Sequence, residues 1–335
     1  MSTMRAAWIA GLLVVVFLAG WLLGARYEAA KITPRKPELR LGEHNFGYRL
    51  INPLLACDAA HNTIDDNELK PFRRKVEQFI NSRKSQHAVS HVSVHFREMN
   101  NGLSFSINGE DKFSPASLLK LPYLVAYLKW EEFEPGLLKR RFTYDKTMQD
   151  FNARQNFKPS QTMERGRSYS VEDLLFRSIA LSDNNAHAIL SRNISPDILH
   201  RAYNDLGLSV PEIRDGEQEM TVREYAAFFR ILFNASYLTR DLSEKALQFL
   251  AEPDFQVGIV AGIPPNIVTA QKYGERVLGN HQELKQLHDC GIVYYPNHPY
   301  LLCIMTRGSS FDPLVDTIRD ISRLVYEEVD QQYKN

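Results

Sequence analysis

The stretch Phe113-Ser114-Pro115-Ala116-Ser117-Leu118-Leu119-Lys120-Leu121-Pro122 leads into an apolar run from Tyr123 to Leu128. Such a run predicts a buried helix. Ser117 and Lys120 are three residues apart, so on a helix they share one face about one turn apart. A hydroxyl beside an amine can work as nucleophile and base if burial keeps the amine partly neutral. An isolated Ser-x-x-Lys is more often a helix cap with a solvated lysine, so the rest of the chain has to decide.

The composition is that of an ordinary globular protein. The 335 residues are 44% hydrophobic and 24% charged, and 40 basic side chains balance 40 acidic ones. This length can bury a large core in one domain or in two smaller ones. Because charge is balanced and no basic, aromatic cluster stands out, we predict no nucleic-acid partner.

The N-terminus differs from this average. Ala6 to Gly24 are 19 residues without a charge, long enough to span a bilayer as a helix. A cleavable signal peptide is the alternative, but no small-residue cleavage site follows closely. We therefore predict a membrane anchor at 1–24, a linker and lead-in segment at 25–68, and a main domain at 69–330. The Lys and Arg residues after the span favour a cytoplasmic main domain, in conflict with the chemistry below.

Strand and helix patterns divide the main domain into three parts. Alternating polarity predicts strands at 92–96 and 103–107, joined by an Asn-Gly turn, with a short strand at 50–55. Capping boxes and apolar periodicity predict helices at 69–80, 123–128, 171–181, 186–191, 196–206, 222–233, 241–250 and 311–329. Late strands are predicted at 267–272, 291–295 and 300–305. This order predicts an α/β fold with one antiparallel sheet from both ends of the domain, a separate all-α lobe, and a site in the cleft between them.

The three cysteines do not indicate whether the protein lies in an oxidising or a reducing compartment. Cys290 and Cys303 flank a predicted hairpin turn at 296–299. With pairing centred on that turn, Cys290 faces Met305, and the two cysteines lie on a diagonal of roughly 7–8 Å. That separation is too long for an easy disulfide, so we infer neither a bridge nor an oxidising environment.

Histidines on the first predicted strand do not form a metal site. Those at 87, 91 and 95 are spaced by four residues. On a strand this spacing corresponds to roughly 13 Å, too far for two side chains to share one ion. A solvent-facing strand edge is the better interpretation, and we predict no metal and no cofactor.

Two further triplets accompany Ser-x-x-Lys. Ser182-Asp183-Asn184 lies where one predicted helix ends and can present a hydroxyl and a carboxamide to a cleft, although a helix cap is the plain alternative. Lys272-Tyr273-Gly274 lies on a predicted strand, where glycine permits close backbone approach. In this order the three motifs resemble those of the penicillin-recognising serine hydrolases, and of class A β-lactamases most of all. The resemblance covers roughly residues 70–329 and implies their two-lobe β-lactamase/transpeptidase-like fold.

The resemblance implies a catalytic role for four positions. Ser117 is the acylated nucleophile, and Lys120 is its proton acceptor. Ser182 passes a proton to the leaving nitrogen. The oxyanion hole would use the backbone N–H groups of Ser117 and Glu275, and the second of these needs no particular side chain.

Substrate binding is implied for four more positions. Asn184 holds the acylamide side chain, and Lys272 supplies positive potential toward the substrate carboxylate, with Gly274 beside it. The family usually has Thr or Ser where Tyr273 stands. A phenol donates its hydrogen bond from another place and is bulkier, so carboxylate recognition is expected to differ.

A second departure concerns release of the acyl group. Class A enzymes carry a Glu on the loop before the helix that Thr221 opens here, and that Glu activates water. Only 39 residues separate Ser182 from Thr221, and no Glu-x-x-Asn lies between them. The acids of this segment predict a solvated turn: Glu212, Asp215, Glu217 and Glu219. Acylation with slow deacylation is the expectation.

Three functions follow from these observations. The leading hypothesis is a membrane-anchored, class A β-lactamase-like serine hydrolase whose implied substrates are β-lactam amides. The missing Glu favours a D-alanyl peptidase that acts on cell-wall peptides. Tyr273 keeps open a non-catalytic cell-wall or partner-binding module on the same fold. The first two hypotheses place the main domain outside the cytoplasm, with a small β-lactam or D-alanyl peptide and the membrane as partners.

Overall fold

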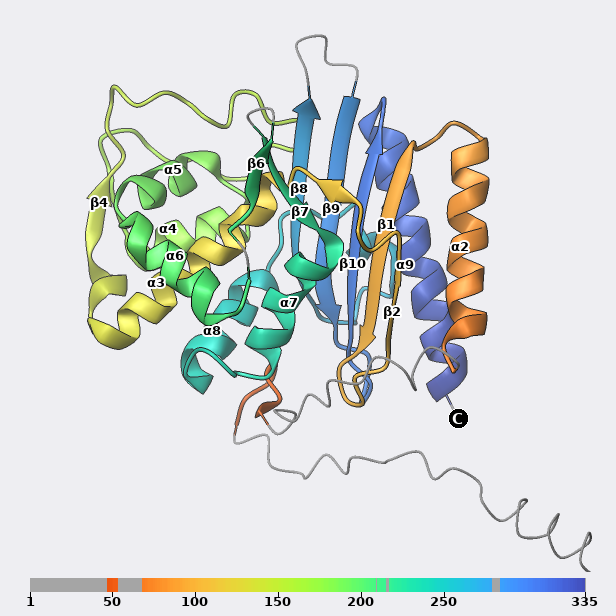
Figure 1. Cartoon of the computed structure of the whole chain (residues 1–335). Coiled ribbons are helices and arrows are strands. Elements are labelled where there is room, and N and C mark those ends of the chain that lie inside the picture. Colours follow the sequence, from red (N-terminus) through yellow and green to blue (C-terminus); the bar gives the residue numbers. More distant parts are fainter. Residues whose placement is uncertain (1–46, 54–67, 209, 215–216, 279–283, 335) are drawn as a thin grey trace, which may run out of the picture. The chain divides into compact units, whose positions relative to one another are not determined.

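The computed structural model describes residues 47–53, 68–208, 210–214, 217–278 and 284–334 (Figure 1). The largest sheet formed by these residues has five antiparallel strands in the order β2-β1-β10-β9-β8. The early strand pair therefore lies beside the late strands, and the predicted sheet built from both ends of the domain is confirmed. The strands are β1 (His91–Glu98), β2 (Ser104–Ile107), β8 (Thr269–Leu278), β9 (Leu284–Val293) and β10 (Tyr300–Gly308).

Two helices cover one face of this sheet (Figure 1). They are α2 (Lys70–Ser85) and α9 (Phe311–Tyr333), and each extends beyond its predicted C-terminal end. Val76 of α2 and Ile321 of α9 are fully buried in one core with Phe96 of β1. Removing side chains of this size from water is the main favourable term that holds the helices on the sheet.

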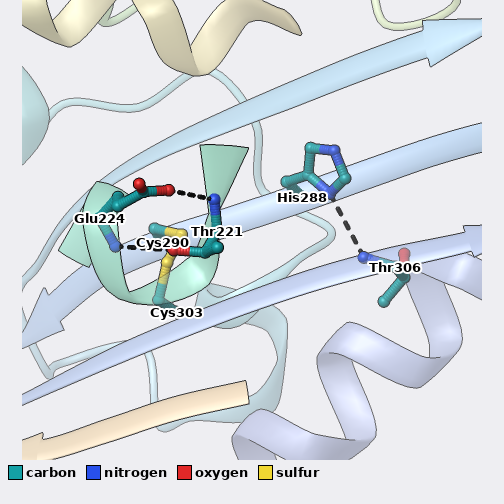
Figure 2. The surroundings of a disulfide bond; sticks show 6 residues. All are labelled: Thr221, Glu224, His288, Cys290, Cys303 and Thr306. Carbon is teal, nitrogen blue, oxygen red and sulfur yellow. Dashed lines mark hydrogen bonds between the residues drawn. A yellow bond between two sulfur atoms is a disulfide. The ribbon is translucent and has the colours of Figure 1, made fainter. Parts of the chain in front are cut away.

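The other face of the sheet meets a helical lobe through α7 (Val222–Phe233), which packs on β1, β9 and β10. A capping box starts α7 as predicted, because the Thr221 hydroxyl accepts from the Glu224 N–H while the Glu224 carboxylate accepts from the Thr221 N–H (Figure 2). The other helices of the lobe are α3 (Lys120–Phe133), α4 (Val171–Ile179), α5 (Asn184–Arg192), α6 (Pro196–Asp205) and α8 (Arg240–Leu250). The predicted two-lobe architecture is therefore present.

The register of the last hairpin corrects the cysteine prediction. Cys290 of β9 pairs directly with Cys303 of β10, and the two form a disulfide (Figure 2). The predicted pairing of Cys290 with Met305 was wrong by two residues, since Met305 pairs with His288. The turn is not centred on residues 296–299, because the strands end at Val293 and Tyr300.

Short strands were missed in segments expected to be polar loops. The predicted solvated turn before Thr221 is instead a hairpin of β6 (Glu212–Arg214) and β7 (Glu217–Thr221). Strand β7 also pairs with β3 (Lys112–Phe113), which leads into the segment that carries Ser117. The polar stretch after α3 contains η3 (Leu137–Lys139) and the paired strands β4 (Arg141–Thr143) and β5 (Ser168–Ser170). A further turn of helix, η4 (Ile259–Gly262), packs on α9.

Two boundaries near α8 also differ from prediction. Helix α8 begins at Arg240 with Thr239 at its N-cap, two residues before the predicted Asp241 cap. Residues 50–53, the described part of a predicted strand, form no strand. The buried Glu244 carboxylate of α8 instead accepts the backbone N–H groups of Arg49, Leu50 and Ile51, which satisfies these donors without a sheet.

The predicted anchor at 1–24 and most of the segment at 25–68 lie outside the described residues. In the part of the chain that is described, no helix combines the length and apolar character needed to cross a membrane. The domain boundaries inferred from the sequence stay predictions.

Candidate active site

Ser117 lies in a short 3₁₀ helix, η2 (Ala116–Leu119), that runs directly into α3 at Lys120. Pro115 accepts a hydrogen bond from the Leu118 N–H at 2.9 Å, and Ala116 has a left-handed φ of 51°. This tight turn precedes Pro122, which has no backbone N–H to donate to the Leu118 carbonyl. Ser117 thereby faces a cavity instead of the helix interior.

The cavity beside Ser117 has a volume of about 490 Å³. It brings together residues from η2, α3, α5, β7 and β8. A second cavity, of about 460 Å³, shares Ser117, Asn184, Glu275 and Arg276 with the first. The described lining of the first cavity is Ser114, Ala116, Ser117, Leu119, Lys120, Asn184, His187, Gln218, Glu275 and Arg276. The predicted cleft is therefore present and contains the predicted nucleophile.

The Lys120 amine is enclosed by oxygen atoms of the second motif. Its Nζ donates to the Ser182 carbonyl and to Asn184 Oδ1, both at 2.7 Å, and lies 3.3 Å from Ser182 Oγ. Burial lowers the pKa of Lys120 to about 7, although the Asp183 and Glu275 carboxylates oppose this. Between the described residues no hydrogen bond joins Lys120 to the Ser117 hydroxyl, but both side chains line the same cavity.

Ser182 is the point where both predicted lysines meet. Its backbone is left-handed, with φ at 53°, and its side chain is fully buried. Ser182 Oγ accepts from Lys272 Nζ at 2.9 Å, in addition to the longer contact with Lys120. The next residue, Asp183, caps α5 by accepting from the Asn185 and Ala186 N–H groups. The plain interpretation as a helix cap is therefore correct for Asp183, and the functional role of Ser182 stays a prediction.

Lys272 is buried on β8 and has three interactions. Besides Ser182 Oγ, its amine donates to the Tyr273 carbonyl at 3.1 Å and lies 4.5 Å from the centre of the Tyr273 ring. Burial, followed by the nearby Lys120 charge, lowers the pKa of Lys272 well below its usual range. Asp289 and Glu275 act in the opposite direction. An aromatic face attracts a cation, which partly offsets the loss of water around this amine.

The two other residues of the third motif serve packing. Tyr273 stacks on Phe255 with ring centres 4.1 Å apart and donates its hydroxyl to the Phe157 carbonyl at 3.1 Å. It belongs to the described lining of neither cavity. A Cβ on Gly274 would lie 2.8 Å from the Pro115 carbonyl oxygen, so this glycine lets η2 approach β8. The predicted contacts of Tyr273 and Gly274 with substrate stay predictions.

Sequence reasoning missed three groups that line the cavities. Gln218 comes from the unexpected strand β7, and His187 lies one turn into α5 with its ring edge-on to Tyr123. Burial, then the Lys120 and Lys272 charges, lowers the pKa of His187 to about 3. The Glu275 carboxylate also lines both cavities, whereas the sequence suggested only its backbone N–H.

A loop that we call the strap, residues 151–157, was also missed. It joins the second motif to β8, through contacts described in detail below. Its one local signal was an Asx turn, in which Asp150 accepts from the Asn152 N–H at 3.0 Å. The strap supplies Phe151, Arg154, Gln155 and Asn156 to the second cavity.

The fold and the three converging motifs are those of a β-lactamase-like hydrolase. The profile of the β-lactamase enzyme family matches residues 71–329, most of the described part of the chain. The chain belongs to this family. No curated protein matches it.

Solved structures with the same fold support this assignment. A mutant of PBP-A, as an acyl-enzyme complex with penicillin G, has a TM-score of 0.65 and 21% identity over 77% of this chain and 97% of its own. A variant of the last common ancestor of Gram-negative class A β-lactamases has a TM-score of 0.65 and 22% identity, over 77% of this chain and 99% of its own. A β-lactamase from Chitinophaga pinensis has a TM-score of 0.65 and 18% identity, over 76% of this chain and 99% of its own. At this identity the likeness shows the fold.

Proposed function

We propose that the protein is a serine hydrolase that forms an acyl-enzyme at Ser117, with β-lactam amides as its substrates. The observation that carries the proposal is the position of Ser182 Oγ between two buried amines, beside a cavity that contains Ser117 and Lys120. Membership of the β-lactamase enzyme family supports hydrolysis as the reaction. A non-catalytic binding module would have no use for two lysines buried at this cost.

Lys120 is the base of the acylation step in this proposal. A neutral amine has two N–H donors, which match the two short hydrogen bonds to the Ser182 carbonyl and Asn184 Oδ1. Its lone pair is then free to accept the Ser117 proton while Ser117 Oγ attacks the substrate carbonyl carbon. The pKa of about 7 makes this neutral form abundant at neutral pH.

Ser182 returns a proton to the leaving group. Because Lys272 donates to Ser182 Oγ, the hydroxyl hydrogen of Ser182 can point toward the leaving nitrogen. As the carbon–nitrogen bond breaks, that nitrogen takes the Ser182 proton, and Ser182 regains one from a neighbouring amine. The backbone N–H groups of Ser117 and Glu275 are assigned to the oxyanion, and Asn184 to the acylamide.

A D-alanyl peptidase is the second candidate. Among the described lining residues of both cavities, Glu275 is the only acid, and it is engaged with strap N–H groups. The hairpin before α7 supplies the neutral Gln218 to the cavity beside Ser117. A site without a free carboxylate activates water poorly, which favours a long-lived adduct with β-lactams.

We also propose that the domain lies outside the cytoplasm and is held at the membrane by residues 1–24. The Cys290–Cys303 disulfide supports an oxidising environment. The apolar span of the sequence supports the anchor. Protease protection in membrane vesicles of defined orientation tests this, since a cytoplasmic domain would be digested from the cytoplasmic face.

Intact-mass measurement with penicillin G tests the chemistry. The described domain should gain the mass of one penicillin, and Ser117→Ala should gain none. An adduct that persists for hours supports the peptidase, and rapid loss supports the lactamase. Absence of any adduct with β-lactams and with activated D-alanyl esters would refute both, while labelling of the Ser117→Ala variant would refute the assigned nucleophile.

A further inference from the structure

The strap is attached firmly to the second motif at one end. Asn152 brackets this motif, because its Nδ2 donates to Asp183 Oδ1 at 2.8 Å and its Oδ1 accepts from the Asn184 N–H at 2.7 Å. Gln155 Nε2 donates to the Ser182 carbonyl at 3.0 Å. These contacts hold the carbonyl of Ser182, the residue with the left-handed φ, and the two residues that follow it.

The other end of the strap is attached to β8 by one carboxylate. Glu275 accepts from the Phe157 N–H at 3.0 Å and from the Asn156 N–H at 3.1 Å. Tyr273 adds a bond from its hydroxyl to the Phe157 carbonyl. A carboxylate that accepts from two successive backbone N–H groups forms charge-assisted bonds, which are shorter and stronger than bonds between neutral groups.

Glu275 thus lies between the strap and the reaction centre. Its own N–H is the one assigned to the oxyanion, so the carboxylate ties that backbone position to the strap. The charged groups around it are Lys120 of α3, Lys272 and Arg276 of β8, and Arg154 of the strap. Burial raises the pKa of Glu275 above its ordinary value, against the opposing effect of these N–H groups and of Lys120 and Lys272.

We propose that Glu275 is a positioning residue, whose carboxylate holds the strap on β8 and so keeps Ser182 in the geometry that acylation needs. The proposal rests on the acyl-enzyme function above. Ser182 cannot hold its left-handed backbone by intrinsic preference, and the Gln155 amide reaches it only while the strap stays in place. Loss of the β8 attachment therefore changes the rate of the chemical step more than it changes substrate affinity.

Acylation kinetics with a chromogenic cephalosporin test this role. For Glu275→Ala we expect the maximal acylation rate constant to fall at least tenfold and up to about 100-fold, with a smaller change in apparent affinity. Glu275→Gln should recover part of this loss, because its amide oxygen can still accept one N–H. Glu110→Gln, at a carboxylate that pairs with Arg223 on the surface, is the matched control and should behave as the unmodified chain.

The pH profile distinguishes positioning from general loss of structure. In the unmodified chain, protonation of Glu275 should add an acid-side loss of activity to the loss that protonation of Lys120 causes, because burial raises the pKa of Glu275. Glu275→Gln cannot titrate at this position, so it should keep the acid limb of Lys120 and lack the additional loss. Equal acylation rates and identical pH profiles for the unmodified chain, Glu275→Ala and Glu275→Gln would overturn the proposal.

Amide hydrogen exchange separates this proposal from the function on which it rests. In Glu275→Ala the N–H groups of Asn156 and Phe157 should exchange at least tenfold faster, with a smaller increase around Ser182, and the Glu110→Gln control should show neither change. If the unmodified chain is never acylated, the proposed function fails, and exchange alone decides whether Glu275 holds the strap. Unchanged exchange in Glu275→Ala would refute the attachment.

Discussion

The N-terminal turn of α3 and the strand β8 each bring one buried lysine to Ser182, but by different means. Lys120 is surrounded by the carbonyl and carboxamide oxygens of the second motif, which lies on a neighbouring helix junction. Lys272 is held by the Tyr273 carbonyl, the Tyr273 ring and Ser182 Oγ. The oxygens around Lys120 accept the two N–H groups of a neutral amine and leave its lone pair free. The aromatic ring beside Lys272 partly offsets the burial that lowers the pKa of that amine. Two similar side chains are thus prepared for different tasks.

The difference teaches that environment assigns the roles of the two amines. The Lys120 charge disfavours the charged form of Lys272, and burial disfavours the charged form of both amines. One of them must give up its proton most readily, and the group with the oxygen-rich, cavity-facing position is the better base. Substituting the lysine of each region separately should therefore lower the acylation rate by unequal amounts.

The largest effect is expected for the two lysines themselves. Lys120→Met should lower the acylation rate constant by about 10³-fold, because general-base assistance is lost. Lys272→Met should lower the acylation rate constant by a smaller factor, since it removes a stabilising charge and leaves Lys120 as the base. Stopped-flow acylation measures both, with Lys129→Met, an α3 lysine paired with Glu132, as the control. Equal losses at both positions would contradict the division of roles.

The support behind β8 can be weakened without touching the lysines. Replacing both Cys290 and Cys303 with serine should lower the free energy of unfolding by about 3 kcal/mol, the scale for a bridge that closes a short loop. Urea denaturation measures this. Acylation by the folded protein should stay within about twofold of the unmodified rate, because neither sulfur lines a cavity among the described residues. A large rate loss would show that the bridge also positions Lys272.

The protonation of Lys120 sets the pH dependence of acylation. The base must be neutral, and its pKa is lowered to about 7, so the rate should rise with pH and level off above that value. Between pH 6 and pH 8 the neutral fraction increases about tenfold. The pH profile of acylation by a neutral ester tests this. A profile that keeps rising to pH 10 would mean that Lys120 has the pKa of a solvated lysine.

The smallest effect is expected at the tyrosine of the third motif. Tyr273→Phe keeps the stacking on Phe255 and removes the hydroxyl, which donates to the Phe157 carbonyl and also interacts with the Ser182 side chain. Loss of one such bond should lower the free energy of unfolding by about 1 kcal/mol. Thermal or urea denaturation measures it, and the acylation rate should change by less than about twofold. A larger loss of acylation rate would show that the Tyr273 hydroxyl has a catalytic role in addition to its packing role.

Local signals in the sequence were sufficient for the helices of the lobe and for the motif residues they carry. The Ser170 side-chain cap and the capping box at Thr221 start α4 and α7 where predicted, because each cap and its partner lie within four residues. The three-residue spacing of Ser117 and Lys120 also depends only on residues that are close together in the chain. These features depend on neighbours along the chain, which a single sequence displays.

The features that sequence reasoning missed depend on distant partners. The bridge required the exact register of β9 and β10, and a shift of two residues was enough to hide it. The strap and Glu275 are 118 residues apart or more, and an exposed-looking glutamate carries no sign of the N–H groups it will accept. Strand β7 likewise exists because β3 and β6 pair with it. Cross-strand register and loop attachment are set by packing that local propensity does not encode.

The left-handed backbones of Ala116 and Ser182 have a thermodynamic consequence. Each residue carries a Cβ in a conformation that costs roughly 1–2 kcal/mol for side chains other than glycine. One lies next to Ser117 and the other receives both lysines, so part of the backbone strain of the described residues lies at the reaction centre. Relaxing these two positions would raise the stability of the fold and change the geometry around Ser117 and Ser182. Stability and geometry therefore oppose each other at this site.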